Sequence, residues 1–140
     1  MWRTLTYSEW TYLIDSRADA SNKYGIASVN NVNGLVLLPD NWTIPTEVTF
    51  ISGTSGNYTQ NTYSVSDWSK MEANGAVFLP AAGNRNGTDV VDVDSGGVYW
   101  SSSAGGYYVA YFLSFGSNDV DTNNSYRSNG QSVRLVQDAE

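Results

Sequence analysis

The most informative strand of this chain is Tyr108-Val-Ala-Tyr-Phe-Leu-Ser-Phe115. The stretch is rich in aromatic and apolar residues, which is typical of a β-strand. Because side chains alternate along a strand, Tyr111, Leu113 and Phe115 share one face. That face is sufficient for a hydrophobic core, so Phe112 and Val109 are expected to point away from it. An outward phenylalanine predicts an apolar patch for a partner. The alternatives are a strand buried on both faces under a helix, or a flexible linker.

Two further strands are predicted around this one, at residues 98–101 and 131–136. In the later strand Val133 and Leu135 lie on the same face, and we expect both in the core. The residues just upstream, 81–97, are polar and glycine-rich, which indicates a loop.

A helix is predicted near the N-terminus. Thr6-Tyr-Ser-Glu9 fits a capping box, in which the Thr6 hydroxyl and the Glu9 carboxylate each accept a hydrogen bond from the other residue's main-chain amide. The helix should end near Arg17. A hairpin is expected next, with strands at 24–32 and 35–38, because Asn33-Gly34 favours the tight type I′ turn.

The middle of the chain contains a second predicted helix, at 66–73, which Asn74-Gly75 ends. A strand follows at 76–79 and is stopped by a proline. We interpret residues 41–63 as a long loop with short extended pieces. Two helices, short antiparallel sheets and long loops predict a single α+β domain over residues 1–140.

The amino-acid composition argues against several classes of function. The 140 residues include no cysteine and no histidine, which removes thiolate chemistry and the usual general base. A formal net charge of −7 argues against a nucleic-acid partner. No apolar run approaches the roughly 20 residues that cross a bilayer, so membrane insertion is not expected. We expect a binding protein and not an enzyme, since no acid and base occur together in a recognisable motif.

One acidic stretch resembles the opening of a calcium loop, Asp92-Val-Asp-Ser-Gly96, with Asp89 nearby. Such a loop needs a bidentate carboxylate at its twelfth position, and here that residue is Ser103. We therefore predict no metal site and no cofactor.

The segment from Ala104 to Gly130 has an unusual composition. Eighteen of its 27 residues are Gly, Tyr, Ser, Asn or Asp, and Arg127 is its only basic residue. Antibody binding loops use the same mixture, because tyrosine gives rigid contact area and the small polar residues give adaptable hydrogen bonds. The segment is therefore a candidate binding surface.

Several motifs of this sequence resemble those of a known protein family. Trp2-Arg-Thr-Leu-Thr6 with Glu9-Trp10 is similar to the helix start of C-type lectin folds of the formylglycine-generating-enzyme type. Residues 67–83, Tyr99-Trp-Ser-Ser-Ser103 and Gly130-Gln-Ser-Val-Arg-Leu-Val136 resemble the Fibrobacter succinogenes major paralogous domain of gut Bacteroidetes and their phages. Many such domains are variable proteins of diversity-generating retroelements, in which adenine replacement diversifies asparagine codons near the C-terminus.

The resemblance implies a C-type-lectin-like fold with a variable segment at about 104–130. The residues at its variable positions, which we expect to contact the ligand, are Gly105, Gly106, Tyr107, Tyr108, Val109, Phe112, Ser114, Gly116, Ser117, Asn118, Asp119, Asp121, Asn123, Asn124, Ser125, Tyr126, Ser128 and Asn129. The anchors among them are the aromatic ones, Tyr107, Tyr108, Phe112 and Tyr126.

The resemblance also implies a role. We expect recognition of a protein or glycan on a bacterial or host surface, outside the cell, on a phage tail or a bacterial surface protein of which this domain is one part. The alternative is a structural or adhesive domain that uses the same face for self-assembly. Formylglycine generation needs cysteines, and sugar binding through calcium needs a Trp-Asn-Asp motif. This chain has neither, so those activities do not carry over.

Overall fold

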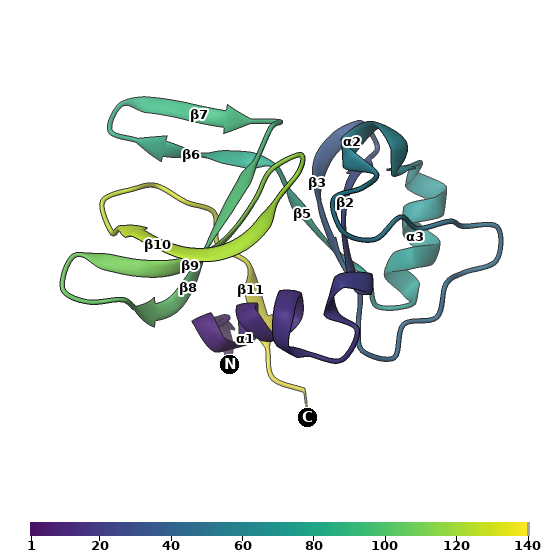
Figure 1. Ribbon diagram of the computed structural model, residues 1–140, viewed down its shortest axis with the longest axis horizontal. Helices are drawn as coiled ribbons and strands as arrows, with labels where there is room; N and C mark the ends of the chain where they lie inside the picture. The colour runs from purple at the N-terminus through teal and green to yellow at the C-terminus, as the bar shows by residue number, and fades with distance from the viewer. Residues whose placement is uncertain (140) are drawn as a thin grey trace.

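The computed structural model describes residues 1–139 and has the α+β architecture that the sequence predicts (Figure 1). In Figure 1 the four-stranded sheet lies with two helices at one end of the molecule, and the five-stranded sheet lies at the other. The α-helices are α1 (Tyr7–Thr11), α2 (Asn57–Gln60) and α3 (Val65–Ala73). The short helix α2 lies inside the predicted loop at 41–63 and was not expected.

The strands form three sheets, with the orders β1-β11, β4-β2-β3-β5 and β10-β9-β8-β6-β7. Their bounds are β1 (Trp2–Thr4), β2 (Tyr24–Val29), β3 (Val32–Leu37), β4 (Thr62–Tyr63), β5 (Val77–Pro80), β6 (Ala82–Asn86), β7 (Asp89–Val93), β8 (Gly97–Ala104), β9 (Val109–Phe115), β10 (Val120–Tyr126) and β11 (Leu135–Gln137). Most pairings are antiparallel, and β2–β4 and β6–β8 are parallel.

The capping box at the start of α1 is confirmed. The Thr6 hydroxyl accepts a hydrogen bond from the Glu9 amide at 3.2 Å, and Glu9 Oε2 accepts one from the Thr6 amide at 2.7 Å. The helix continues as a π-helical turn, η1 (Tyr12–Ser16), and ends at Arg17 as predicted. A 3₁₀ turn, η2 (Ala20–Asn22), then leads into β2. The capping box and the turns that follow thus fix the position of α1, whose Trp10 packs in the core between the two large sheets.

The predicted turn of the β2–β3 hairpin is wrong. Val29 pairs with Val32, so the turn consists of Asn30 and Asn31, whose φ angles are 48° and 65°. Asparagine tolerates this left-handed conformation, so it replaces the glycine that a type I′ turn favours. Gly34 lies inside β3, where a Cβ atom would come within 2.4 Å of the Leu79 carbonyl oxygen. The glycine therefore serves the close approach of β5 and not the turn.

The second predicted helix is confirmed as α3, and the strand after it as β5. The Ser64 hydroxyl caps α3 by accepting a hydrogen bond from the Asp67 amide at 3.1 Å. The preceding loop is held onto β2 by the buried side chain of Asn61. Its amide nitrogen donates to the carbonyl oxygens of Ile26 and Ile51, at 3.0 and 2.9 Å.

The loop predicted at 81–97 is wrong, because most of it forms the hairpin β6–β7. Asn86 pairs with Asp89 across the turn, and the sheet continues to Ala82 paired with Val93. Every residue of β7 is exposed, so the strand has no buried face to produce the alternation that marks a strand in the sequence.

The strand predicted at 131–136 is also largely wrong. Residues 130–132 form only single bridges to Arg85 and Tyr99, and regular pairing resumes in β11, which lies against β1. Val133 and Leu135 are each 53% exposed, so neither is in the core as predicted. The chain leaves the five-stranded sheet at this point, and its side chains therefore lie outside the interior.

The core consists of two apolar clusters. One lies between the two large sheets and α1, and it contains Trp10, Ile26, Leu35, Leu79, Tyr99, Leu113 and Phe115. The other lies between α3 and the four-stranded sheet, and it contains Ala27, Val36, Leu38 and Met71. The predicted core positions Leu113 and Phe115 are confirmed, whereas Tyr111 is half-buried. No helix within residues 1–139 is both long and apolar enough to cross a membrane.

Candidate binding surface

The strands β8, β9 and β10 position most of the candidate residues. Phe112 lies opposite Trp100 on one side and Asn123 on the other, and Ser114 lies opposite Asp121. Directly paired residues share a face, so the face opposite the core carries Phe112, Ser114, Asp121, Asn123 and Ser125. The predicted alternation of Tyr111, Leu113 and Phe115 onto one face of β9 and of Phe112 onto the other is therefore confirmed.

This outward face is crossed by the chain itself. The Arg127 amide donates to the Tyr108 carbonyl, beyond one edge of the face, and Gly130 exchanges main-chain hydrogen bonds with Arg85 of β6, beyond the other. Between these two points the chain passes from the β10 side of the sheet to the far side of β8. Gln131 Nε2 donates to Ser125 Oγ at 2.9 Å, which places the crossing on the Phe112 face.

Phe112 lies on the face that the crossing segment, residues 127–131, passes over, and it is not fully exposed. Phe112 packs edge-on against Trp100 with 6.2 Å between the ring centroids, and both side chains are half-buried. The side-chain oxygen of Gln131 is buried and has no hydrogen-bond partner among the described residues. Phe112 therefore packs partly beneath this surface and also forms part of it. Of the other candidates in this segment, Ser128 is exposed and Asn129 is half-buried.

A cluster of exposed tyrosines lies at one end of the sheet. Tyr107 and Tyr108 form the turn between β8 and β9 and are 86% and 72% exposed. Tyr126, 66% exposed, ends β10 and pairs with Val109, the residue after Tyr108. We call Tyr107, Tyr108 and Tyr126 the tyrosine tip. It is the largest concentration of exposed aromatic side chains within the described part of the chain.

Arg127 holds the backbone of the tyrosine tip. Its Nη2 donates to the Gly106 carbonyl at 2.7 Å, and its Nε donates to the Val109 carbonyl at 3.2 Å. Gly106 has a φ of 137°, which other residues rarely adopt. Gly105 and Gly106 therefore contribute to the backbone shape of the tip and add no side chain to its surface.

The turn between β9 and β10 lies at the opposite end of the sheet. β9 is seven residues long, so about 20 Å separates this turn from the tyrosine tip. Ser117 and Asn118 of the turn line two neighbouring hollows, of about 330 and 420 Å³. Most of the residues that line them have polar side chains, among them Asp92, Ser95 and Asp119 in the first and Asn33, Thr54, Asn57 and Thr59 in the second.

Tyr58 fixes the wall of the second hollow. Its hydroxyl donates to the Ser95 carbonyl at 2.9 Å and thereby ties α2 to the turn before β8. Burial raises the pKa of Tyr58 to about 12, so the hydroxyl remains a donor throughout the physiological pH range. This hydrogen bond joins a residue of the second hollow, Tyr58, to a residue of the first, Ser95.

Three predicted contact residues lie on the other face of the sheet. Val109, Asn124 and Tyr126 alternate onto the side that carries Tyr111, next to α1, so the outward direction predicted for Val109 is wrong. The candidate set therefore divides into the tyrosine tip, the partly covered face, the polar turn, Val109 and Asn124. Trp100 and the β6–β7 hairpin border the face but were not among the predicted residues. The strand periodicity of 98–101 is the signal that could have found Trp100.

The acidic stretch Asp92–Gly96 forms part of β7 and of the turn that follows it. Within residues 1–139 no three side chains of the kind that bind metals lie close together. Ser103, at the position where a calcium loop needs its bidentate acid, has another use, because its hydroxyl accepts a hydrogen bond from the Tyr7 amide at 2.9 Å. This contact ties the start of α1 to β8.

Comparisons of the chain with protein-family models, with curated proteins and with solved structures found no match. The sequence motifs and the geometry of this surface are therefore the basis for a functional assignment.

Proposed function

We propose that the chain is a recognition domain with a C-type-lectin-like fold that binds a partner through the tyrosine tip. The observation that carries the proposal is the exposure of three tyrosines at one end of the five-stranded sheet. Exposed aromatic clusters on soluble proteins are often interaction sites. Tyrosine is also enriched among the residues that dominate binding energy.

The physical advantage of this surface is its preorganisation. Tyrosine has few rotatable bonds, so fixing it in a complex loses little conformational entropy. The backbone beneath it is already held by two hydrogen bonds from Arg127. Binding therefore avoids much of the ordering cost that flexible loops incur. The polar turn at the other end of β9 would add hydrogen bonds from Asn118 and Asp119 to a partner large enough to reach it.

The resemblance to this family supports a proposal for where the domain acts and what it binds. A domain of this type would act on a phage tail or a bacterial surface, and its partner would be a protein or glycan on another bacterial or host cell. Binding is favoured over catalysis because the chain has neither cysteine nor histidine to serve as nucleophile or base.

The test is flow cytometry of the fluorescently labelled chain against a panel of fixed gut bacteria. Where the wild type labels a strain, the variant Tyr107→Ser/Tyr108→Ser/Tyr126→Ser should lose at least about tenfold in apparent affinity, as expected for aromatic anchors. Trp2→Ser is the matched control, since Trp2 is equally exposed but lies outside the tip. Labelling that survives in the triple variant, or is lost in the control, would place the site elsewhere.

Self-association is the competing function of the same surface. Sedimentation of the wild type over a wide concentration range separates the two. A mass that rises with concentration, and no longer does so in the tip triple variant, would assign the tyrosines to assembly and not to recognition of another molecule.

A further inference from the structure

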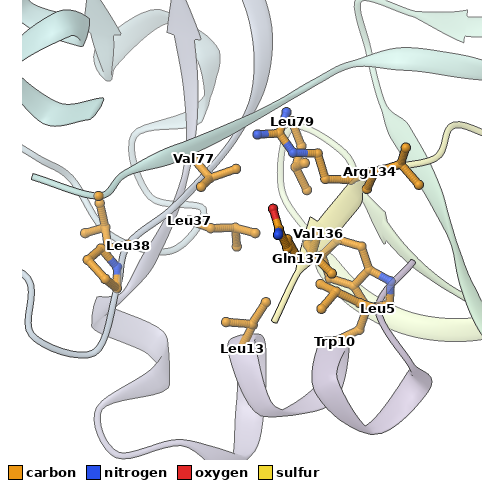
Figure 2. Close-up of a pocket in the computed structure, with 13 residues that line it drawn as sticks. Leu5, Trp10, Leu13, Leu37, Leu38, Val77, Leu79, Arg134, Val136 and Gln137 are labelled. Carbon is orange, nitrogen blue, oxygen red and sulfur yellow. The ribbon is translucent and has the colours of Figure 1, made fainter. Parts of the chain in front are cut away.

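A largely apolar groove lies outside the tyrosine tip, where α1, η1, β3, β5 and β11 meet (Figure 2). Its volume is about 320 Å³, at the lower end of the range found for small-molecule sites. The walls carry Leu5, Trp10, Leu13, Leu37, Val77 and Leu79. Trp10, Leu37 and Leu79 belong to the first core cluster and are buried, and Leu5, Leu13 and Val77 pack against it partly buried, so the groove opens on the edge of that cluster.

The groove has polar groups only where β11 passes it. Arg134 and Gln137 both line the space. In Figure 2 the Gln137 amide lies among Leu37, Val77 and Leu13, and the Arg134 guanidinium lies beside Leu79. One polar side of an otherwise apolar hollow is the arrangement that orients an amphiphilic ligand.

Arg134 differs from the other arginines of the chain. Arg3 and Arg17 form ion pairs, and Arg85 and Arg127 donate to main-chain carbonyls. Arg134 has no ion pair and no side-chain hydrogen bond within residues 1–139. Its charge at the rim of an apolar groove is unmatched, although the chain as a whole has a net charge of −7. A planar guanidinium suits a carboxylate, which it can bind through two parallel hydrogen bonds.

We propose that this groove binds an aliphatic carboxylic acid of medium chain length, with the tail against Leu13, Leu37 and Val77 and the carboxylate at Arg134. The volume holds on the order of ten non-hydrogen atoms, at roughly 30 Å³ each. The tail is recognised by burial of apolar surface and the head by charge, with Gln137 as a further donor. This site is independent of the tyrosine tip and does not rest on the proposed recognition function.

The experiment titrates the full chain with decanoate below its micelle concentration. The indole N–H resonance of Trp10 is the reporter, because Trp10 is buried at the wall of the groove. Decyltrimethylammonium, with the same tail and the opposite charge, is the matched probe. Decanoate should shift the Trp10 resonance saturably with one site per chain, and decyltrimethylammonium should bind at least about tenfold more weakly.

Three variants test the residues. Arg134→Gln should weaken decanoate binding at least about tenfold, and Arg85→Gln, which removes the same charge from β6, should leave it unchanged. Val77→Phe fills the groove and should abolish binding, with thermal unfolding confirming that this variant folds. Three outcomes would overturn the proposal: no saturation, equal affinity for the two probes, or full affinity in Arg134→Gln. A concentration-dependent mass that Val77→Phe abolishes would instead make a second copy of the chain the occupant, and would overturn it too.

Discussion

The ring of Tyr7, the first residue of α1, is stacked on the ring of Tyr111 in β9, with 4.2 Å between the centroids and 30° between the planes. The Tyr7 amide also donates to the Ser103 hydroxyl in β8. One residue therefore attaches the N-terminal helix to both strands of the hairpin that carries the tyrosine tip. Tyr111 is half-buried, because the Tyr7 ring covers one side of it and the core does not enclose it.

The Tyr7–Tyr111 stack should be measurable as a coupling energy. Tyr7→Ala and Tyr111→Ala should each destabilise the domain, and the double variant should be more stable than additivity predicts by about 0.5–1.5 kcal/mol, the usual value of an aromatic pair. Urea unfolding of the four proteins gives the cycle. Additive single effects would mean that the stacking contributes nothing beyond burial.

The two faces of β9 should differ in their effect on stability. Leu113 is fully buried, so Leu113→Ala should cost roughly 2–5 kcal/mol. Tyr107→Ser and Tyr108→Ser remove exposed side chains and should each stay within about 0.5 kcal/mol. Urea denaturation of the three variants checks this. A large loss from either tyrosine would show that the tip supports the fold.

The β2–β3 turn gives a prediction on backbone conformation. Asn31→Gly should be neutral or slightly stabilising, since glycine adopts a φ of 65° without strain. Gly34→Ala should cost roughly 1–3 kcal/mol or more, because its Cβ would meet the Leu79 carbonyl. Thermal unfolding distinguishes them. The opposite ranking would return the turn to Asn33-Gly34.

Acid stability should depend on Glu9. Hydrogen bonds from the Arg3 guanidinium and the Thr6 amide lower the pKa of Glu9 from 4.5 to about 2. A lowered carboxylate pKa adds stability that is present above the unfolded-state value and is lost as the pH falls toward the folded-state value. Glu9→Gln keeps the capping geometry without the charge.

The Glu9→Gln variant should therefore melt below the wild type at pH 7, and the difference should shrink between about pH 4.5 and pH 2. Melting temperatures at pH 7, 4.5 and 2.5 provide the measurement. A difference that stays constant down to pH 2.5 would show that the charge of Glu9 does not contribute.

The sequence predicted those elements whose signal is local. The capping box at Thr6 and Glu9 and the alternation through Leu113 and Phe115 depend on neighbouring residues, and both were found as predicted. The missed elements depend on distant partners. β7 pairs with β6 while all its residues face solvent, and β10 is polar but completes the sheet through main-chain bonds to β9. Val133 and Leu135 look like core residues because nothing local tells where the chain leaves the sheet.

The candidate site was predictable in composition but not in layout. Tyrosines at 107, 108 and 126 are evident in the sequence, whereas their meeting at one end follows from the pairing of Tyr126 with Val109. The partial covering of Phe112 follows from the crossing segment, which depends on a bridge between Gly130 and Arg85 far upstream. The role of Gly106 is likewise not evident from the sequence. Because its φ is 137°, a substitution there would change the backbone shape of the tip as well as add a side chain.

The crossing segment is fastened by main-chain atoms at both of its ends, at Tyr108 and at Arg85, and so is the paired ladder of β9 and β10. Amide and carbonyl groups are the same whatever side chain a residue bears. The frame of this surface is therefore largely indifferent to which side chains stand at the exposed positions Asn123 and Ser128, and these positions can accept new side chains one at a time or together. A molecule built in this way can acquire a new partner without first acquiring a new shape.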